Sequence, residues 1–142
     1  MVKRARPVGR RVRFFVVPGA DEAVQKALVT AIHEAGHEVV NDPFGALRAS
    51  PLAAAERSVF LGAVDRMLEA DALAADVTRE GATAAWCVAW MLAKGRLCVL
   101  ACRRDARANL SPMLAGNPSP WQRLVAYDAP ADLATSLRAL LA

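Results

Sequence analysis

The chain has 142 residues, of which 55% are hydrophobic, and a formal net charge of +4. This length fits one domain with a core of its own, and the composition excludes a disordered chain. No apolar run reaches the roughly 20 residues that a membrane helix needs, and "VRFFVV" is too short for the apolar region of a signal peptide. We therefore expect a cytoplasmic protein whose three cysteines are reduced thiols.

Strand and helix signals alternate from residue 12 onward. Short β-rich apolar runs predict strands at residues 12–17, 37–41, 71–77, 96–102 and 122–128. Helical periodicity predicts helices at residues 21–36 and 52–70, after Gly81, and at 132–142, while residues 41–51 and 103–121 are predicted to be loops. Together these elements predict an α/β fold: a single open, mainly parallel five-stranded sheet with helices on both faces, flavodoxin-like or Rossmann-like.

Ligands bind such sheets beyond the carboxyl ends of the strands. The expected surroundings of a site are therefore the loops at residues 18–21, 41–52, 78–83 and 102–120. From the first three of these loops we expect the ligand-binding residues Pro18, Gly19, Asp42, Thr78 and Gly81. The turn "PGAD" lacks a G-x-G-x-x-G pattern, and its aspartate would cap the next helix itself and repel a phosphate.

Basic residues are concentrated at the N-terminus. Residues 1–13 hold six of the 18 Lys and Arg and no acid, which leaves 12 bases against 14 acids in the rest of the chain. We interpret residues 1–11 as a basic tail and residues 12–142 as one domain. The interpretation that we favour for the tail is a solvated terminus; contact with nucleic acid or an anionic surface is the alternative.

The segment "HEAGH", from His33 to His37, matches the zinc pattern H-E-x-x-H. That chemistry needs both histidines on one face of a helix and a glutamate that polarises a zinc-bound water. Here Gly36 predicts the end of the helix, and His37 begins a predicted strand, so the two imidazoles should diverge. We expect no metal, and a zinc hydrolase that uses His33 and His37 remains a remote alternative.

Several segments occur in an order and spacing shared with a known family. They are Ala70-Asp71, Ala75-Asp76-Val77, Gly95-Arg96 and "LSPMLAG" at residues 110–116. In this order the chain resembles the nucleoside 2-deoxyribosyltransferase superfamily, and most closely its 2'-deoxynucleoside 5'-phosphate N-hydrolase branch. The resemblance covers residues 12–142 and implies cleavage of the bond between base and deoxyribose, with a nucleophilic glutamate, an assisting aspartate and no cofactor.

The acidic positions that the resemblance implies are substituted in this chain. Cys87 stands where the family has its nucleophilic glutamate, and Ala63 where it has the assisting aspartate. A neutral thiol does not supply the fixed negative charge, and its apolar neighbours should keep it neutral. The resemblance thus implies a protein that binds a nucleotide or related small ligand with a degenerate catalytic site. The alternative is an active N-glycosidase or transferase that uses a shifted carboxylate such as Glu80.

Trp86 and Trp90 share one face of the helix that follows Gly81. Such an aromatic pair favours a core or a subunit interface over a base-stacking platform, and we expect a homodimer. In the family that the chain resembles, the "LSPM" segment reaches across the dimer to the partner's site. The resemblance therefore adds Ser111 and Met113 to the expected ligand-binding residues.

Overall fold

The computed structural model describes residues 10–44, 53–79 and 81–141. Its strands are β1 (Arg13–Val16), β2 (Glu38–Val39), β3 (Ala72–Asp76), β4 (Leu97–Arg103) and β5 (Gln122–Tyr127). Its helices are α1 (Glu22–Glu34), α2 (Ala53–Glu69), α3 (Ala82–Ala93), α4 (Pro112–Ala115) and α5 (Pro130–Leu141), with a 3-10 helix, η1 (Arg104–Asn109), between β4 and α4. None of these helices is long and apolar enough to cross a membrane.

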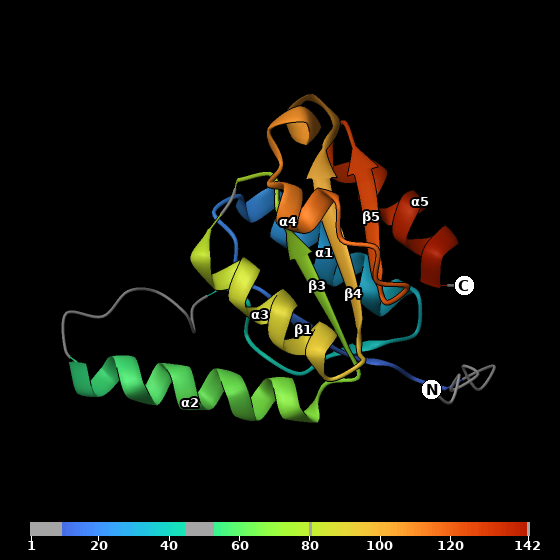
Figure 1. The fold of residues 1–142 in the computed structure, drawn as a ribbon. Coiled ribbons are helices and arrows are strands. Elements are labelled where there is room, and N and C mark those ends of the chain that lie inside the picture. The colour runs from blue at the N-terminus through green and yellow to red at the C-terminus, as the bar shows by residue number, and fades with distance from the viewer. Residues whose placement is uncertain (1–9, 45–52, 80, 142) are drawn as a thin grey trace.

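The five strands form one parallel sheet in the order β2-β1-β3-β4-β5. This is the flavodoxin-like order, and it confirms the predicted open α/β fold. Helices α1 and α5 cover one face of the sheet, and α2, α3 and α4 lie on the other (Figure 1). The order of the strands reverses between β1 and β3, so a crevice is expected at their carboxyl ends.

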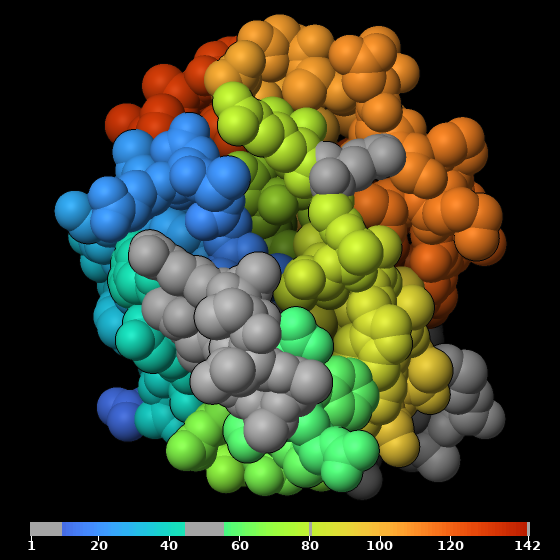
Figure 2. Space-filling view, turned by 90° about the vertical axis from the view of Figure 1, so that its left-hand side faces the viewer, coloured from blue at the N-terminus to red at the C-terminus, as the bar shows by residue number. Residues whose placement is uncertain are grey.

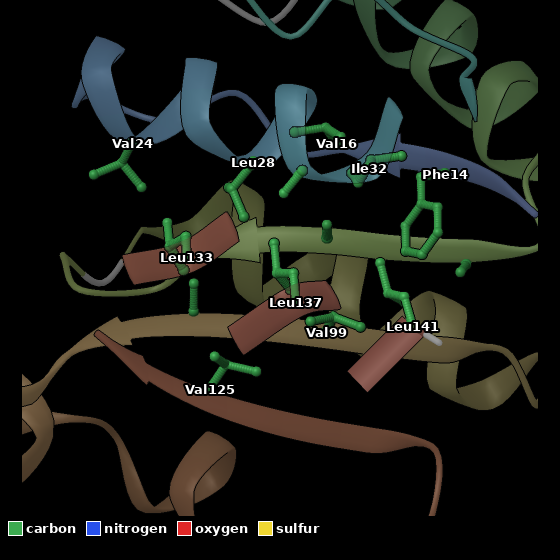
Figure 3. Close-up of a cluster of buried hydrophobic side chains, with 14 of the residues drawn as sticks. Phe14, Val16, Val24, Leu28, Ile32, Val99, Val125, Leu133, Leu137 and Leu141 are labelled. Carbon is green, nitrogen blue, oxygen red and sulfur yellow. The ribbon is translucent and has the colours of Figure 1, made fainter. Parts of the chain in front are cut away.

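Two hydrophobic cores lie between the sheet and the helices that pack on its two faces. The first packs side chains of α1 and α5, such as Leu28 and Leu137, against Phe14 and Val99 on the sheet (Figure 3). The second packs α2 and α3 against the other face, with Met67 and Met91 almost fully buried. Each large side chain buried in this way contributes about 1.5–3 kcal/mol, so both faces of the sheet are fixed.

Asp21 and Gly36 determine where α1 begins and ends. Asp21 caps its start, since the carboxylate accepts from the backbone N–H of Ala23 at 3.0 Å and of Val24 at 3.2 Å. After the end of α1 at Glu34, Gly36 has φ +83°, a conformation that glycine adopts without strain. The predicted helix start and stop are therefore confirmed.

The prediction of a loop at residues 103–121 is wrong in part, because that segment contains η1 and α4. Helix α4 begins with Pro112 at its first position, and the hydroxyl of Ser111 accepts from the backbone N–H of Met113 at 3.2 Å. A helix of four residues is too short to show hydrophobic periodicity, so only its cap could have revealed it. The predicted tail falls largely on residues 1–9, which lie outside the described residues.

Candidate functional site

A cleft of about 520 Å³ lies beside α3, beyond the carboxyl end of β3. Its walls are the segment after β3, one side of α3 from Ala82 to Leu92, and the region of α4. Three of the residues expected to bind ligand meet in this cleft: Gly81, Ser111 and Met113. We refer to it as the α3 cleft, and its volume is in the usual range for small-molecule sites.

The α3 cleft combines an apolar wall with a few groups that attract anions. Val88, Leu92 and Leu114 line the apolar side. Gly81 precedes α3 and has no side chain that could cap it, so the first N–H groups of the helix receive no hydrogen bond from this position and carry partial positive charge. Arg79 adds a full positive charge, and none of the described residues that line the cleft carries a carboxylate. The cleft therefore suits a ligand with an apolar body and an anionic group.

A second cleft, of about 530 Å³, lies between the ends of β1 and β2 and one side of α2. Asp42, another expected ligand-binding residue, is found here, and its carboxylate accepts from the backbone N–H of Phe44 at 3.0 Å. Ala63 lines the same cleft from α2, and Arg66 does so while paired with Glu69 at 3.1 Å. The position that the family resemblance assigns to the assisting aspartate is thus part of this second cleft.

Cys87 does not line either cleft. Its side chain is 3% exposed and packs in the second core together with Val88, Met91 and Cys98. Burial raises the pKa of the Cys87 thiol to about 11. Burial, and then the neighbouring Cys87, raise the pKa of Cys98 to about 12. Both thiols are neutral at physiological pH, as the apolar neighbours of Cys87 predict. Glu80 lies outside the described residues.

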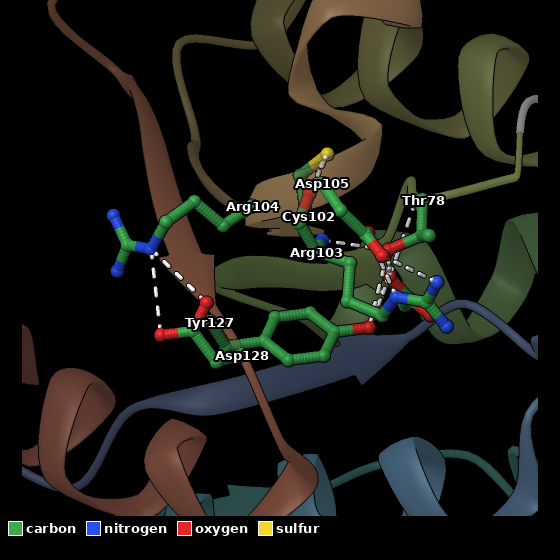
Figure 4. A network of polar contacts seen from close by, with 8 residues as sticks. Thr78, Cys102, Arg103, Arg104, Asp105, Tyr127 and Asp128 are labelled. Atoms are coloured by element: carbon green, nitrogen blue, oxygen red, sulfur yellow. Dashed lines mark hydrogen bonds and ion pairs between the residues drawn. The ribbon is translucent and has the colours of Figure 1, made fainter.

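Thr78 connects the carboxyl ends of three strands (Figure 4). Its hydroxyl donates to the Asp76 carboxylate at 2.6 Å and accepts from the backbone N–H of Arg103 at 2.9 Å. The Tyr127 hydroxyl lies 3.1 Å from the Thr78 hydroxyl and donates to Asp76 at 3.2 Å. These contacts join the ends of β3, β4 and β5 and give Thr78 a structural role next to the α3 cleft.

Tyr127 holds this network together as a protonated phenol. Its side chain is 1% exposed, and burial raises its pKa to about 12. Two ion pairs flank the network, Arg103 with Asp105 at 2.9 Å and Arg104 with Asp128 at 3.2 Å. A buried phenol of this kind does not exchange protons near neutral pH, so it fixes the edge of the sheet without acting as an acid.

The remaining expected residues, Pro18 and Gly19, lie in the connection from β1 to α1 and line neither of the two clefts. Figure 2 shows that the surface is hollowed between this connection, in blue, and the yellow-green start of α3. The side-chain amide of Gln25 donates to the carbonyl of Val17 at 2.8 Å beside it. This hollow is the crevice expected between the ends of β1 and β3.

Three residues around the α3 cleft were not predicted from the sequence. Arg79 and Asn117 line the cleft, and Tyr127 supports its edge from β5. Arg79 lies in the loop at residues 78–83. A positive charge just before a helix that begins with glycine could have indicated an anion-binding residue. Tyr127 ends a strand, and its contact with Thr78 spans 49 residues, so no local pattern could indicate it.

The two histidines of "HEAGH" occupy different structural settings. His33 is exposed in the last turn of α1. His37 lies beyond Gly36, outside the helix, where its Nδ1 accepts from the backbone N–H of Val12 at 3.0 Å. Within the described residues no group of three or more His, Cys, Asp or Glu is placed to hold a metal ion. The geometry gives no support to a zinc hydrolase.

Comparison with protein-family models and with curated proteins finds no match for this chain. The resemblance to the deoxyribosyltransferases rests on the sequence segments described above alone, while the fold and the clefts come from the structure.

Proposed function

We propose that this chain is a nucleoside 2-deoxyribosyltransferase-like protein that binds a nucleotide or a related small anionic ligand in the α3 cleft. The observation that carries the proposal is the composition of that cleft. An uncapped helix start and Arg79 lie beside an apolar wall. The negative charge of a phosphate is complementary to Arg79 and the helix start, and the flat ring of a base can pack against the apolar wall.

In this proposal the catalytic step of the family is absent. The thiol of Cys87 is neutral and buried in the core, and Ala63, which lines the second cleft, carries no carboxylate. A sugar cation developing during base release would therefore lack the negative charge that stabilises it. An active N-glycosidase that uses Glu80 is the competing proposal, because Glu80 is the residue between Arg79 and Gly81 in the sequence.

Binding can be tested by calorimetry with deoxynucleoside monophosphates. We expect Arg79→Ala to weaken binding by about tenfold, since a hydrogen bond to a charged group contributes about 1.5–3 kcal/mol. Arg138→Ala is the matched control, because this arginine is also exposed but pairs with Glu34 on the opposite face of the sheet. Equal loss in both variants, or no binding by the wild type, would contradict a site in the α3 cleft.

We also propose that the protein is a cytoplasmic homodimer. Helix α3 contains no charged residue, and Trp86 on its outer side is 44% exposed. Trp86 stacks on Trp90 with ring centroids 6.5 Å apart and meets Phe60 of α2 edge-on at 5.3 Å. A helix that is apolar on its outer side favours a covering subunit. The three free cysteines support a reducing compartment.

A further inference from the structure

Helix α2 exposes an apolar face to solvent. Between residues 56 and 69 only Met67 is buried. Leu61 is 53% exposed and Leu68 51% exposed. Figure 1 shows α2 on the outside of the molecule, below α3. A helix that buries so little of its own apolar surface is stabilised when another element covers it.

Charges on this face are arranged symmetrically about its centre. Arg57 lies four residues before Leu61, and Asp65 lies four residues after it, so all three share one side of the helix. Both charged side chains are exposed, and neither forms an ion pair with any described residue. We call the four residues Arg57, Leu61, Asp65 and Leu68 the α2 stripe.

The α2 stripe is complementary to itself. When two such helices pack antiparallel about a two-fold axis at Leu61, the residue four positions before the centre faces the residue four positions after it. Arg57 of each copy then meets Asp65 of the other, and opposite charges face each other twice. A different partner protein would have to supply this same pattern, whereas a second copy carries it already.

We propose that α2 packs antiparallel against α2 of a second copy, with Leu61 at the two-fold axis and an Arg57–Asp65 ion pair on each side. This inference rests on the proposed homodimer and specifies its contact. The edge-on pair of Phe60 and Trp86 extends the apolar surface from the α2 stripe onto α3. Covering this surface supplies the affinity, and the ion pairs fix the register of the two helices.

Charge reversal in sedimentation equilibrium tests the contact. Arg57→Glu and Asp65→Arg each place like charges opposite one another at both symmetric positions, and we expect each to raise the dimer dissociation constant by about tenfold or more. The double variant Arg57→Glu/Asp65→Arg restores opposite charges in exchanged positions, so its dissociation constant should return to within about threefold of the wild-type value. Circular dichroism checks that every variant is folded.

Lys26→Glu is the matched control for Arg57→Glu. It makes the same change of charge on the exposed side of α1, on the other face of the sheet. If the wild type is a dimer and the single α2 variants raise its dissociation constant no more than Lys26→Glu does, the α2 contact is contradicted and the dimer is not. A double variant no stronger than the singles would contradict the proposed register. A monomeric wild type would overturn the dimer and its contact together, while ligand binding is decided separately by calorimetry.

Discussion

Cys87 and Cys98 illustrate how burial alone decides the chemistry of a side chain. Their thiols have pKa values raised from 9.0 to about 11 and about 12. Above pH 9 the unfolded chain releases protons that the folded protein retains, so the free energy of unfolding falls as the pH rises. We expect urea unfolding to show this fall between pH 9 and about 11, with a smaller slope in Cys87→Ala. Equal slopes in the two proteins would contradict a buried neutral thiol at position 87.

Thr78 and Tyr127 make contributions of different size to the edge of the sheet. Thr78→Val removes a donor to Asp76 and leaves the backbone N–H of Arg103 without its acceptor, so we expect a loss of about 1–3 kcal/mol in unfolding free energy. Tyr127→Phe removes a hydroxyl whose loss leaves Asp76 with its Thr78 contacts; a loss of about 1 kcal/mol is expected. Chemical denaturation measures both, and a larger loss for Tyr127→Phe would contradict this account.

At the same scale, the sequence predicted some site residues and missed others for a physical reason. Gly81, Ser111 and Met113 were expected to bind ligand, and they do line one cleft. Gly81 was expected because parallel strands bring successive loops to one edge of the sheet, and Ser111 and Met113 were expected from the family resemblance. The contact between Thr78 and Tyr127 depends on the packing of two strands that are not neighbours in the sheet. Tertiary contacts of that kind leave no trace in local periodicity.

At the scale of elements, two glycines make opposite predictions. Gly36 has φ +83°, so Gly36→Ala should destabilise the protein by about 1–2 kcal/mol. Gly62 lies inside α2, and a Cβ there would meet nothing within 4 Å. Gly62→Ala should therefore stabilise the protein by about 0.5–1 kcal/mol. Thermal unfolding measures both, and the same sign for the two variants would contradict the helix boundaries.

The end of α1 also decides the "HEAGH" segment. His37 lies past the helix and its Nδ1 is occupied by the backbone N–H of Val12. We expect the purified protein to hold no stoichiometric zinc, as elemental analysis after purification without added metal will measure. One tightly bound zinc per chain that is lost in His33→Ala would contradict this expectation.

The long helices and the strands followed from the sequence, and the short helices did not. The periodicity of residues 21–36 and 52–70 predicted α1 and α2 to within a few residues. Strand β2, predicted at residues 37–41, is found at Glu38–Val39, whereas η1 and α4 were predicted to be part of a loop. These two helices are too short to show a periodic apolar pattern.

At the scale of the whole molecule, α3 lies between the proposed ligand site and the proposed dimer contact. Its sheet side buries Cys87 in the core, a second side from Ala82 to Leu92 lines the α3 cleft, and Trp86 on its outer side contacts Phe60 of α2. The fold class could be predicted because five strands alternate with helices along the chain. Two clefts of similar size could not, since a cleft depends on how side chains of separate elements fill the space between them.

Base release from deoxynucleoside monophosphates, followed by chromatography, tests the central claim most directly. The claim is that the chain binds such a ligand without cleaving it, since the family's acidic positions hold Cys87 and Ala63. Wild type, Cys87→Ala and Glu80→Gln should all release no more base than buffer does, at ligand concentrations where calorimetry shows binding. Turnover by the wild type that survives in Cys87→Ala and disappears in Glu80→Gln would contradict the claim and identify Glu80 as the nucleophile.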